Sequence, residues 1–390
     1  MIMASCVRFL QCAGFRFDSP SWDGPETWTA LRNKDLWQTF EAVLSLCRSE
    51  KIEFLFITGD LFEQEYVRKE TVERVARSFA QLEGARIFIT PGRRDPLILT
   101  SAYRLAVWPK NVHIFSSGVS SIKIPSHNLI VFGEGWTTYH QEGPFLNGFQ
   151  TTSDGTLQLM LLHAEVDSEK NTEGFIPIRQ EEIASSGLAY LALGKREVWS
   201  GIQQAGETFW ADCGAPEARG FQDNGPHGVL LGEIGKESSR FEFRELGQRS
   251  YIDKDLTFQS QADFENVSAN LLAETNLEDR QNNLFRFKLS GTLFEVEGML
   301  QTVKNLLETQ FRFAEVLSLE RKSPSQSQFE SRGVSGVKHS EGYPTLAQIF
   351  VHKLQKNLVD VKGSENSQYW ELVQKIGLTA LGQGRGFDED

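Results

Sequence analysis

The chain has 390 residues, of which 40% are hydrophobic and 24% charged, and its formal net charge is −12. This length is ample for a sizeable core, and the acidic charge argues against a protein whose whole surface grips nucleic acid. The 4 cysteines form no Cys-x-x-Cys pair, which is typical of reduced thiols in a cytoplasmic protein. No segment approaches about 18 uninterrupted apolar residues, so we expect neither secretion nor a membrane span.

The first part of the chain predicts strands that alternate with helices. Short apolar runs and apolar residues at helical spacing predict strands at residues 7–11, 53–57 and 85–90, and helices at 34–48 and 67–82. The segment before residue 34 is rich in Pro, Gly and Trp and is expected to be irregular. This order predicts a parallel sheet with right-handed crossovers. Gly59-Asp60 follows the second strand and would deliver a carboxylate into the crevice at the end of the sheet.

From residue 112 onwards the pattern changes to short strands separated by turn residues. Strands are predicted at residues 112–115, 121–124, 128–132, 157–162, 189–193, 207–212, 228–234 and 240–245. The last three of these look like a closing antiparallel set. We therefore expect an α/β fold in which two sheets form an α/β/β/α sandwich over residues 1–246, with most strand ends at one rim.

A smaller unit is predicted after residue 247. Residues 247–320 contain a strand at 284–290, a helix at 292–308 and a strand at 311–318, which together indicate a compact α+β capping domain. Residues 321–342 are rich in Ser and Gly without periodicity and are expected to be a linker. Residues 343–390 carry amphipathic helices at 343–359 and 368–381, whose apolar faces suit docking on a partner helix or covering the protein's own core.

Four strand-end signatures follow one another along the chain. They are the loop at residues 12–17, Gly59-Asp60, Pro91-Gly92-Arg93-Arg94-Asp95, and His163 together with Gly194-Lys195-Arg196-Glu197. With these signatures, residues 7–245 resemble the calcineurin-like metallophosphoesterase superfamily, in particular the nuclease subunits of DNA-repair complexes of the SbcD and YhaO type. The resemblance implies a capping domain that helps to position DNA, and C-terminal helices that bind the coiled coil of an SMC-like ATPase.

The chain departs from this family at most metal-ligand positions. The family pattern is Asp-x-His, Gly-Asp, Gly-Asn-His-Asp, a lone His and Gly-His-x-His, and it holds two divalent metals that clamp the phosphate and generate a hydroxide. The comparison leaves Asp60, His163 and Asp95 in place and offers Glu197 as a substitute ligand. The positions of lost ligands are occupied by Arg16, Arg93, Arg94, Lys195 and Arg196.

Arginine side chains cannot replace these ligands, because they keep their proton at workable pH and repel a cation. Arg94, at the position of the family's catalytic histidine, is also too basic for general acid catalysis near neutral pH. We therefore expect no catalytic residue, no metal centre and no cofactor. Either the cations pair with Asp60, Asp95, Glu197 and Asp18 as a salt-bridge plug, or their guanidinium groups form an anion site for a phosphate or a nucleic-acid backbone.

Three functions follow from this pattern. The first is a non-catalytic homologue of the nuclease subunit of a bacterial DNA-repair complex, which acts as a scaffold, senses DNA or phosphate, or regulates an ATPase partner. The second is an active phosphoesterase or exonuclease that uses manganese or another divalent metal on Asp60, His163 and Glu197. The third is a purely structural subunit that binds neither metal nor nucleic acid. The expected partners are an SMC-like ATPase, DNA and a second copy of the chain, and no membrane.

Overall fold

The computed structural model describes residues 6–140, 145–152, 154–167, 177–258, 260–291 and 297–318. They belong to a compact unit, Met1–Arg321, whereas a second unit, Lys322–Asp390, lies outside the described residues. The predicted linker and both predicted C-terminal helices also lie outside them. The division of the first unit at residue 246 stays a prediction. No helix of the described residues has the length and apolar character needed to cross a membrane.

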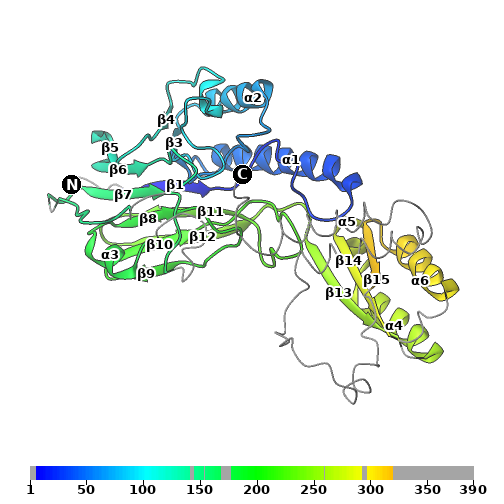
Figure 1. Ribbon diagram of the computed structural model, residues 1–390. Helices are drawn as coiled ribbons and strands as arrows, with labels where there is room; N and C mark the ends of the chain where they lie inside the picture. The colour runs from blue at the N-terminus through cyan, green and yellow to red at the C-terminus, as the bar shows by residue number, and fades with distance from the viewer. Residues whose placement is uncertain are drawn as a thin grey trace, which may run out of the picture. The chain divides into compact units, whose positions relative to one another are not determined.

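Within the described residues, the first large sheet has the strand order β12-β11-β1-β2-β3-β4 (Figure 1). Its strands are β1 (Val7–Cys12), β2 (Phe54–Ile57), β3 (Arg86–Ile89), β4 (Val112–Ile114), β11 (Gly228–Ile234) and β12 (Ser239–Glu245). Strands β1 to β4 are parallel, which confirms the predicted parallel sheet, and β11 runs antiparallel to β1 and β12.

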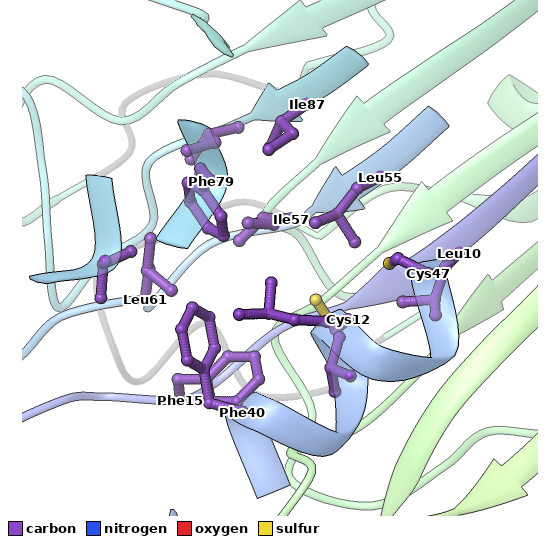
Figure 2. Close-up of a cluster of buried hydrophobic side chains, with 14 of the residues drawn as sticks. Leu10, Cys12, Phe15, Phe40, Cys47, Leu55, Ile57, Leu61, Phe79 and Ile87 are labelled. Carbon is purple, nitrogen blue, oxygen red and sulfur yellow. The ribbon is translucent and has the colours of Figure 1, made fainter. Parts of the chain in front are cut away.

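Helices α1 (Thr29–Ser49) and α2 (Lys69–Ala80) pack on the outer face of this sheet. Figure 2 shows Phe40 of α1 and Phe79 of α2 in the same apolar cluster as Leu55 and Ile57 of β2. The prediction that α1 starts at residue 34 was wrong. The first turns of α1 lack an apolar stripe because buried Arg32 is held there by ion pairs rather than by apolar contacts.

The second large sheet has the strand order β5-β6-β7-β8-β10-β9. Its strands are β5 (Ser120–Ile124), β6 (Leu129–Glu134), β7 (Leu157–Leu162), β8 (Tyr190–Leu193), β9 (Gln203–Ala205) and β10 (Thr208–Asp212). Its inner face packs on the first sheet, where Phe9 and Phe56 meet Leu159 and Tyr190. Helix α3 (Gln180–Ser185) covers the outer face through Ile183. The layers are therefore α/β/β/α, as predicted.

The predicted closing antiparallel set is confirmed for β11 and β12, which pair antiparallel, and was wrong for β10. Strand β10 belongs to the second sheet and runs parallel to β8, whereas β11 and β12 belong to the first sheet. The physical reason is burial on both faces: Ala211 contributes to the core between the sheets, and Trp210 to the core under α3. A strand buried on both sides suits an interior, parallel position.

A third, parallel sheet has the order β13-β14-β15. It comprises β13 (Tyr251–Thr257), β14 (Leu284–Ser290) and β15 (Ala314–Ser318), with α4 (Gln261–Glu274), α5 (Leu277–Asn282) and α6 (Glu297–Gln310). The predictions of β14, β15 and α6 are confirmed, although α6 ends later than predicted, and β13, α4 and α5 were not predicted. Short 3-10 turns lie at Glu26–Trp28, Ala102–Arg104 and Pro125–His127.

Candidate functional site

The candidate site lies beyond the carboxyl ends of β1, β2, β3 and β7, where two glycines allow the turns to approach closely. Gly59 has a φ of +97°, and a Cβ at this position would collide with the ring of His163. A Cβ on Gly92 would collide with the carboxylate of Asp60. Both turns therefore need glycine. Gly14, which stands where the family has an Asp, has a φ of +66°, and a Cβ there would lie 3.1 Å from the Cβ of Ala215.

The structure brings Asp60 and His163 together. The Nδ1 of His163 donates a hydrogen bond to the carbonyl of Thr58 (3.0 Å), so Nε2 faces the Oδ1 of Asp60 at 3.5 Å. The same Oδ1 accepts the backbone N–H of Arg94 (2.8 Å). The His163 side chain is 1% exposed and the Asp60 side chain 14%. The two retained ligand positions are therefore adjacent, and their orientation is held by backbone groups.

Asp95 anchors the backbone of both turns. Its carboxylate accepts the N–H groups of Asp60 (3.0 Å), Leu61 (2.7 Å) and Gly92 (2.7 Å), and also the hydroxyl of Tyr103 (2.6 Å). Burial, reinforced by the charge of Asp60, raises the pKa of Asp95 to about 6. The salt-bridge hypothesis gave Asp95 a cationic partner, but these hydrogen bonds show that its carboxylate holds the backbone instead.

Arg16 is the most enclosed of the predicted cations. Its Nη2 lies 3.1 Å from the Oε2 of Glu63, and its Nη1 lies 3.4 Å from the Oε1 of Glu197. The Arg94 Nη1 lies 3.6 Å from the other oxygen of Glu63. The side chains of Arg16 and Glu63 are 9% and 8% exposed. Sequence reasoning missed Glu63, and its signal was a carboxylate shortly after the Gly-Asp turn in an otherwise apolar stretch.

The other predicted cations lie at different places around the rim. Lys195 Nζ is 3.7 Å from the Oε2 of Glu165. The backbone N–H groups of Lys195 and Arg196 donate to the Oδ2 of Asp212 at 2.9 and 2.8 Å, and burial raises the pKa of Asp212 to about 6. The side chain of Arg196 is exposed and that of Arg93 half-buried.

Asp18, which the salt-bridge hypothesis included, binds elsewhere. Its carboxylate accepts the backbone N–H of Arg68 (3.0 Å) and the hydroxyl of Thr71 (2.6 Å), at the start of α2. An anion there stabilises the positive end of the helix. Asp18 therefore caps α2 and does not balance the cations at the rim.

The described residues do not fit a two-metal centre. Among them, no three or more His, Cys, Asp or Glu side chains are grouped so that they could hold a metal ion. Glu197, the predicted substitute ligand, faces Arg16 at 3.4 Å. A carboxylate that is already paired with a guanidinium is a weak metal ligand. The arrangement can neutralise charge and present N–H donors, and we derive no metal-dependent step from it.

Known proteins show a limited similarity to this chain in sequence. No family model matches the chain. It is 22% identical over 254 residues to the uncharacterized metallophosphoesterase YhaO of Bacillus subtilis (strain 168). That alignment covers 62% of this chain and 61% of YhaO, so the chain spans less than two thirds of the relative's length.

Two solved structures were also found to be similar. TT1561 of Thermus thermophilus has a TM-score of 0.40 at 12% identity, over 62% of this chain and 99% of that one. The purple acid phosphatase PPD1 from yellow lupin (Lupinus luteus) has a TM-score of 0.41 at 10% identity, over 63% and 52%. The chain is therefore similar over part of its length to a metallophosphoesterase, and its two packed sheets form an α/β/β/α sandwich.

Proposed function

We propose that the chain is a non-catalytic homologue of the nuclease subunit of a bacterial DNA-repair complex, acting as a scaffold or as a sensor of phosphate or nucleic acid. The observation that supports it is the enclosed guanidinium of Arg16, which lies within 3.4 Å of carboxylates from two loops. Two unit charges about 4 Å apart at an effective dielectric of about 20 interact by roughly 4 kcal/mol, and a dication would be repelled more strongly. The guanidinium of Arg16 therefore supplies a permanent positive charge at the site, as a metal ion would.

The groups around Asp60 also favour a non-catalytic role. The Oδ1 of Asp60 already accepts the backbone N–H of Arg94. The Arg94 side chain cannot donate a proton to a leaving group near neutral pH, because a guanidinium holds its proton too tightly. Without an activated water and a proton donor, a bound phosphodiester would stay intact.

The biological setting is part of the proposal. The resemblance to nuclease subunits favours a cytoplasmic complex in which residues 343–390 bind an SMC-like ATPase. The unit after residue 247 would act as a cap beside DNA, and the chain would associate as a homodimer.

The test is elemental analysis of purified protein together with a manganese-dependent nuclease assay. We expect far less than one metal per chain, and turnover no higher than that of Asp60→Ala. Stoichiometric manganese, with turnover that disappears in Asp60→Ala, would overturn the proposal.

The second candidate function is a phosphoesterase with a reduced metal site. The specific observation that favours it is the orientation of His163, whose Nδ1 is committed to Thr58 while Nε2 points to Asp60. In metal sites, a hydrogen bond from one ring nitrogen to a backbone carbonyl orients the imidazole so that the other nitrogen can bind the ion. Glu197 would have to leave Arg16 to complete such a site. The assays above separate the two functions.

A further inference from the structure

A cavity of about 320 Å³ opens beside the candidate site, and Arg219 forms part of its wall. The cavity lies between the loop that carries Arg16 and Trp22 and the loop that carries Arg219 and Asp223, and Glu197 completes it. It is therefore built mainly from polar side chains. The predicted anion site shares only Arg16 with this cavity, and the other members of the wall were not part of that prediction.

Arg219 is a buried guanidinium with unused donors. The residue is 7% exposed, and its Nη2 donates to the carbonyls of Phe15 and Arg16. Its Cζ lies 4.0 Å from the centroid of the Trp22 ring, which holds the guanidinium plane in place. No described residue accepts a hydrogen bond from its Nε or Nη1. Buried N–H groups without acceptors are costly and are rare in native proteins.

The positive charge of Arg219 is poorly balanced as well. Burial and the nearby charge of Arg16 lower the pKa of Arg219 to about 9, although Glu197 opposes this effect. The wall also holds three carboxylates, of which two accept backbone N–H groups: the Asp223 Oδ2 those of Arg219 and Gly220 at 2.8 and 3.0 Å, and the Asp23 Oδ2 that of Phe221 at 3.2 Å. Glu197 faces Arg16 at 3.4 Å and is 39% exposed, so it has room to turn into solvent.

We propose that this cavity binds an oxyanion of the phosphate type between Arg219 and Arg16, with Glu197 giving up its place beside Arg16. This inference rests on the proposed function, because it identifies where a phosphate-sensing subunit would hold its ligand. A stacked, immobile guanidinium suits oxyanions because it presents parallel N–H donors in a fixed plane. The ligand would balance the charges of the two arginines.

Isothermal titration calorimetry with inorganic phosphate, and separately with a short single-stranded oligonucleotide, tests the proposal. We expect Arg219→Gln to weaken binding by about tenfold or more, as for the loss of a charge-assisted hydrogen bond. Glu197→Gln should strengthen binding, because it removes the competitor for Arg16. Arg77→Gln, which removes a charge on α2 whose side chain is 69% exposed and does not line the cavity, is the matched control and should stay within about twofold of wild type.

The two ligands identify the source of the anion. Binding of phosphate alone points to a free anion, and binding of the oligonucleotide alone points to a nucleic-acid backbone. Either result supports the proposed site if the Arg219 and Glu197 variants change the affinity as stated.

Arg219→Gln also leaves the carbonyl of Phe15 without its donor, so this variant could fail to fold. In that case the affinity of Glu197→Gln alone tests the proposal. Unchanged affinity in Glu197→Gln, or no binding of either ligand, overturns the inference. If neither ligand binds, and the protein also holds no metal and shows no turnover, this inference fails but the proposed function stands. Manganese-dependent turnover would refute the proposed function itself.

Discussion

The ion pair between Arg16 and Glu63 offers the sharpest test of how the site is held together. Replacing Arg16 by methionine keeps a long side chain but removes the charge. Among the ion pairs of the described residues, Glu63, whose side chain is 8% exposed, would keep only the one with Arg94 at 3.6 Å, from a side chain that is 48% exposed. The variant therefore leaves a buried carboxylate with one weak partner.

The size of the effect follows from burial. Removing one member of a buried ion pair costs about 3–5 kcal/mol, and we expect the lower end, about 3 kcal/mol, because Arg94 compensates in part. Replacing both members by methionine should cost much less, since a well-packed apolar pair is often as stable as the ion pair. The double-mutant cycle should then give a coupling energy of about 2–3 kcal/mol.

Urea unfolding followed by circular dichroism at pH 7 measures these differences. The control is Lys69→Met, which breaks a pair with Glu73 whose side chains are 64% and 40% exposed, and which we expect to leave stability unchanged within error. Raising the salt concentration should barely alter the Arg16 coupling, because buried pairs are screened weakly. A loss below about 1 kcal/mol in Arg16→Met, with no coupling to Glu63, would refute the reasoning.

Three further predictions concern the backbone, the thiols and the pH dependence. Gly59→Ala should destabilise the protein by about 2–4 kcal/mol, because the added Cβ collides with the His163 ring. Gly84→Ala is the control: Gly84 also has a positive φ but lies in open space, so the substitution should cost only about 1 kcal/mol. Equal losses of unfolding free energy in urea would contradict this prediction. Burial raises the pKa of all four cysteine thiols, but Cys12, Cys47 and Cys213 are also enclosed, whereas Cys6 is half-buried. A thiol reagent should therefore label only Cys6 rapidly in the native protein and all four cysteines in denaturant, and rapid labelling of a second native thiol would count against this prediction. The pKa of the Asp212 carboxyl is about 6 in the folded protein, against an ordinary value of 3.8, so the folded protein holds this proton more tightly than the unfolded chain does. The bound proton therefore stabilises the folded protein by about 3 kcal/mol at low pH, and this stabilisation is lost as the pH rises from about 4 to 6. Asp212→Asn should show a shallower fall of unfolding free energy across that range, and an unchanged slope would disprove the assignment.

Much of the first sheet could be predicted because its information is local. The run Phe54–Ile57 is apolar throughout and ends at Gly59-Asp60, so both the strand and the placement of its carboxylate follow from a few neighbouring residues. Strand β13 was missed because Asp253, Lys254 and Asp255 hide its apolar alternation. Its charges are balanced across the sheet, as when Lys288 of β14 binds Asp253 at 2.9 Å, and such pairing between distant segments cannot be seen in the sequence of one strand.

In the candidate site, too, some features could be predicted from the sequence, whereas contacts between distant segments could not. Resemblance brought Asp60 and His163 to one place, and the structure puts them 3.5 Å apart. The partner of Arg16 could not be predicted, because it depends on a left-handed backbone, with a φ of 45° at Arg16, that turns the side chain toward Glu63. Arg219 arrives from a loop far along the chain, and only the folded protein shows that its donors are left unused.

The conformation of Gly14 bears on whether a bimetallic centre could be built into this protein. An aspartate at that position would need a side chain on a left-handed backbone with Ala215 3.1 Å from its Cβ. Introducing the ligands of the family pattern one at a time would therefore meet steric resistance at this position, where Ala215 would have to shift by a few tenths of an ångström. The backbone of this loop, as well as its side chains, thus disfavours the carboxylate that the resemblance implies there.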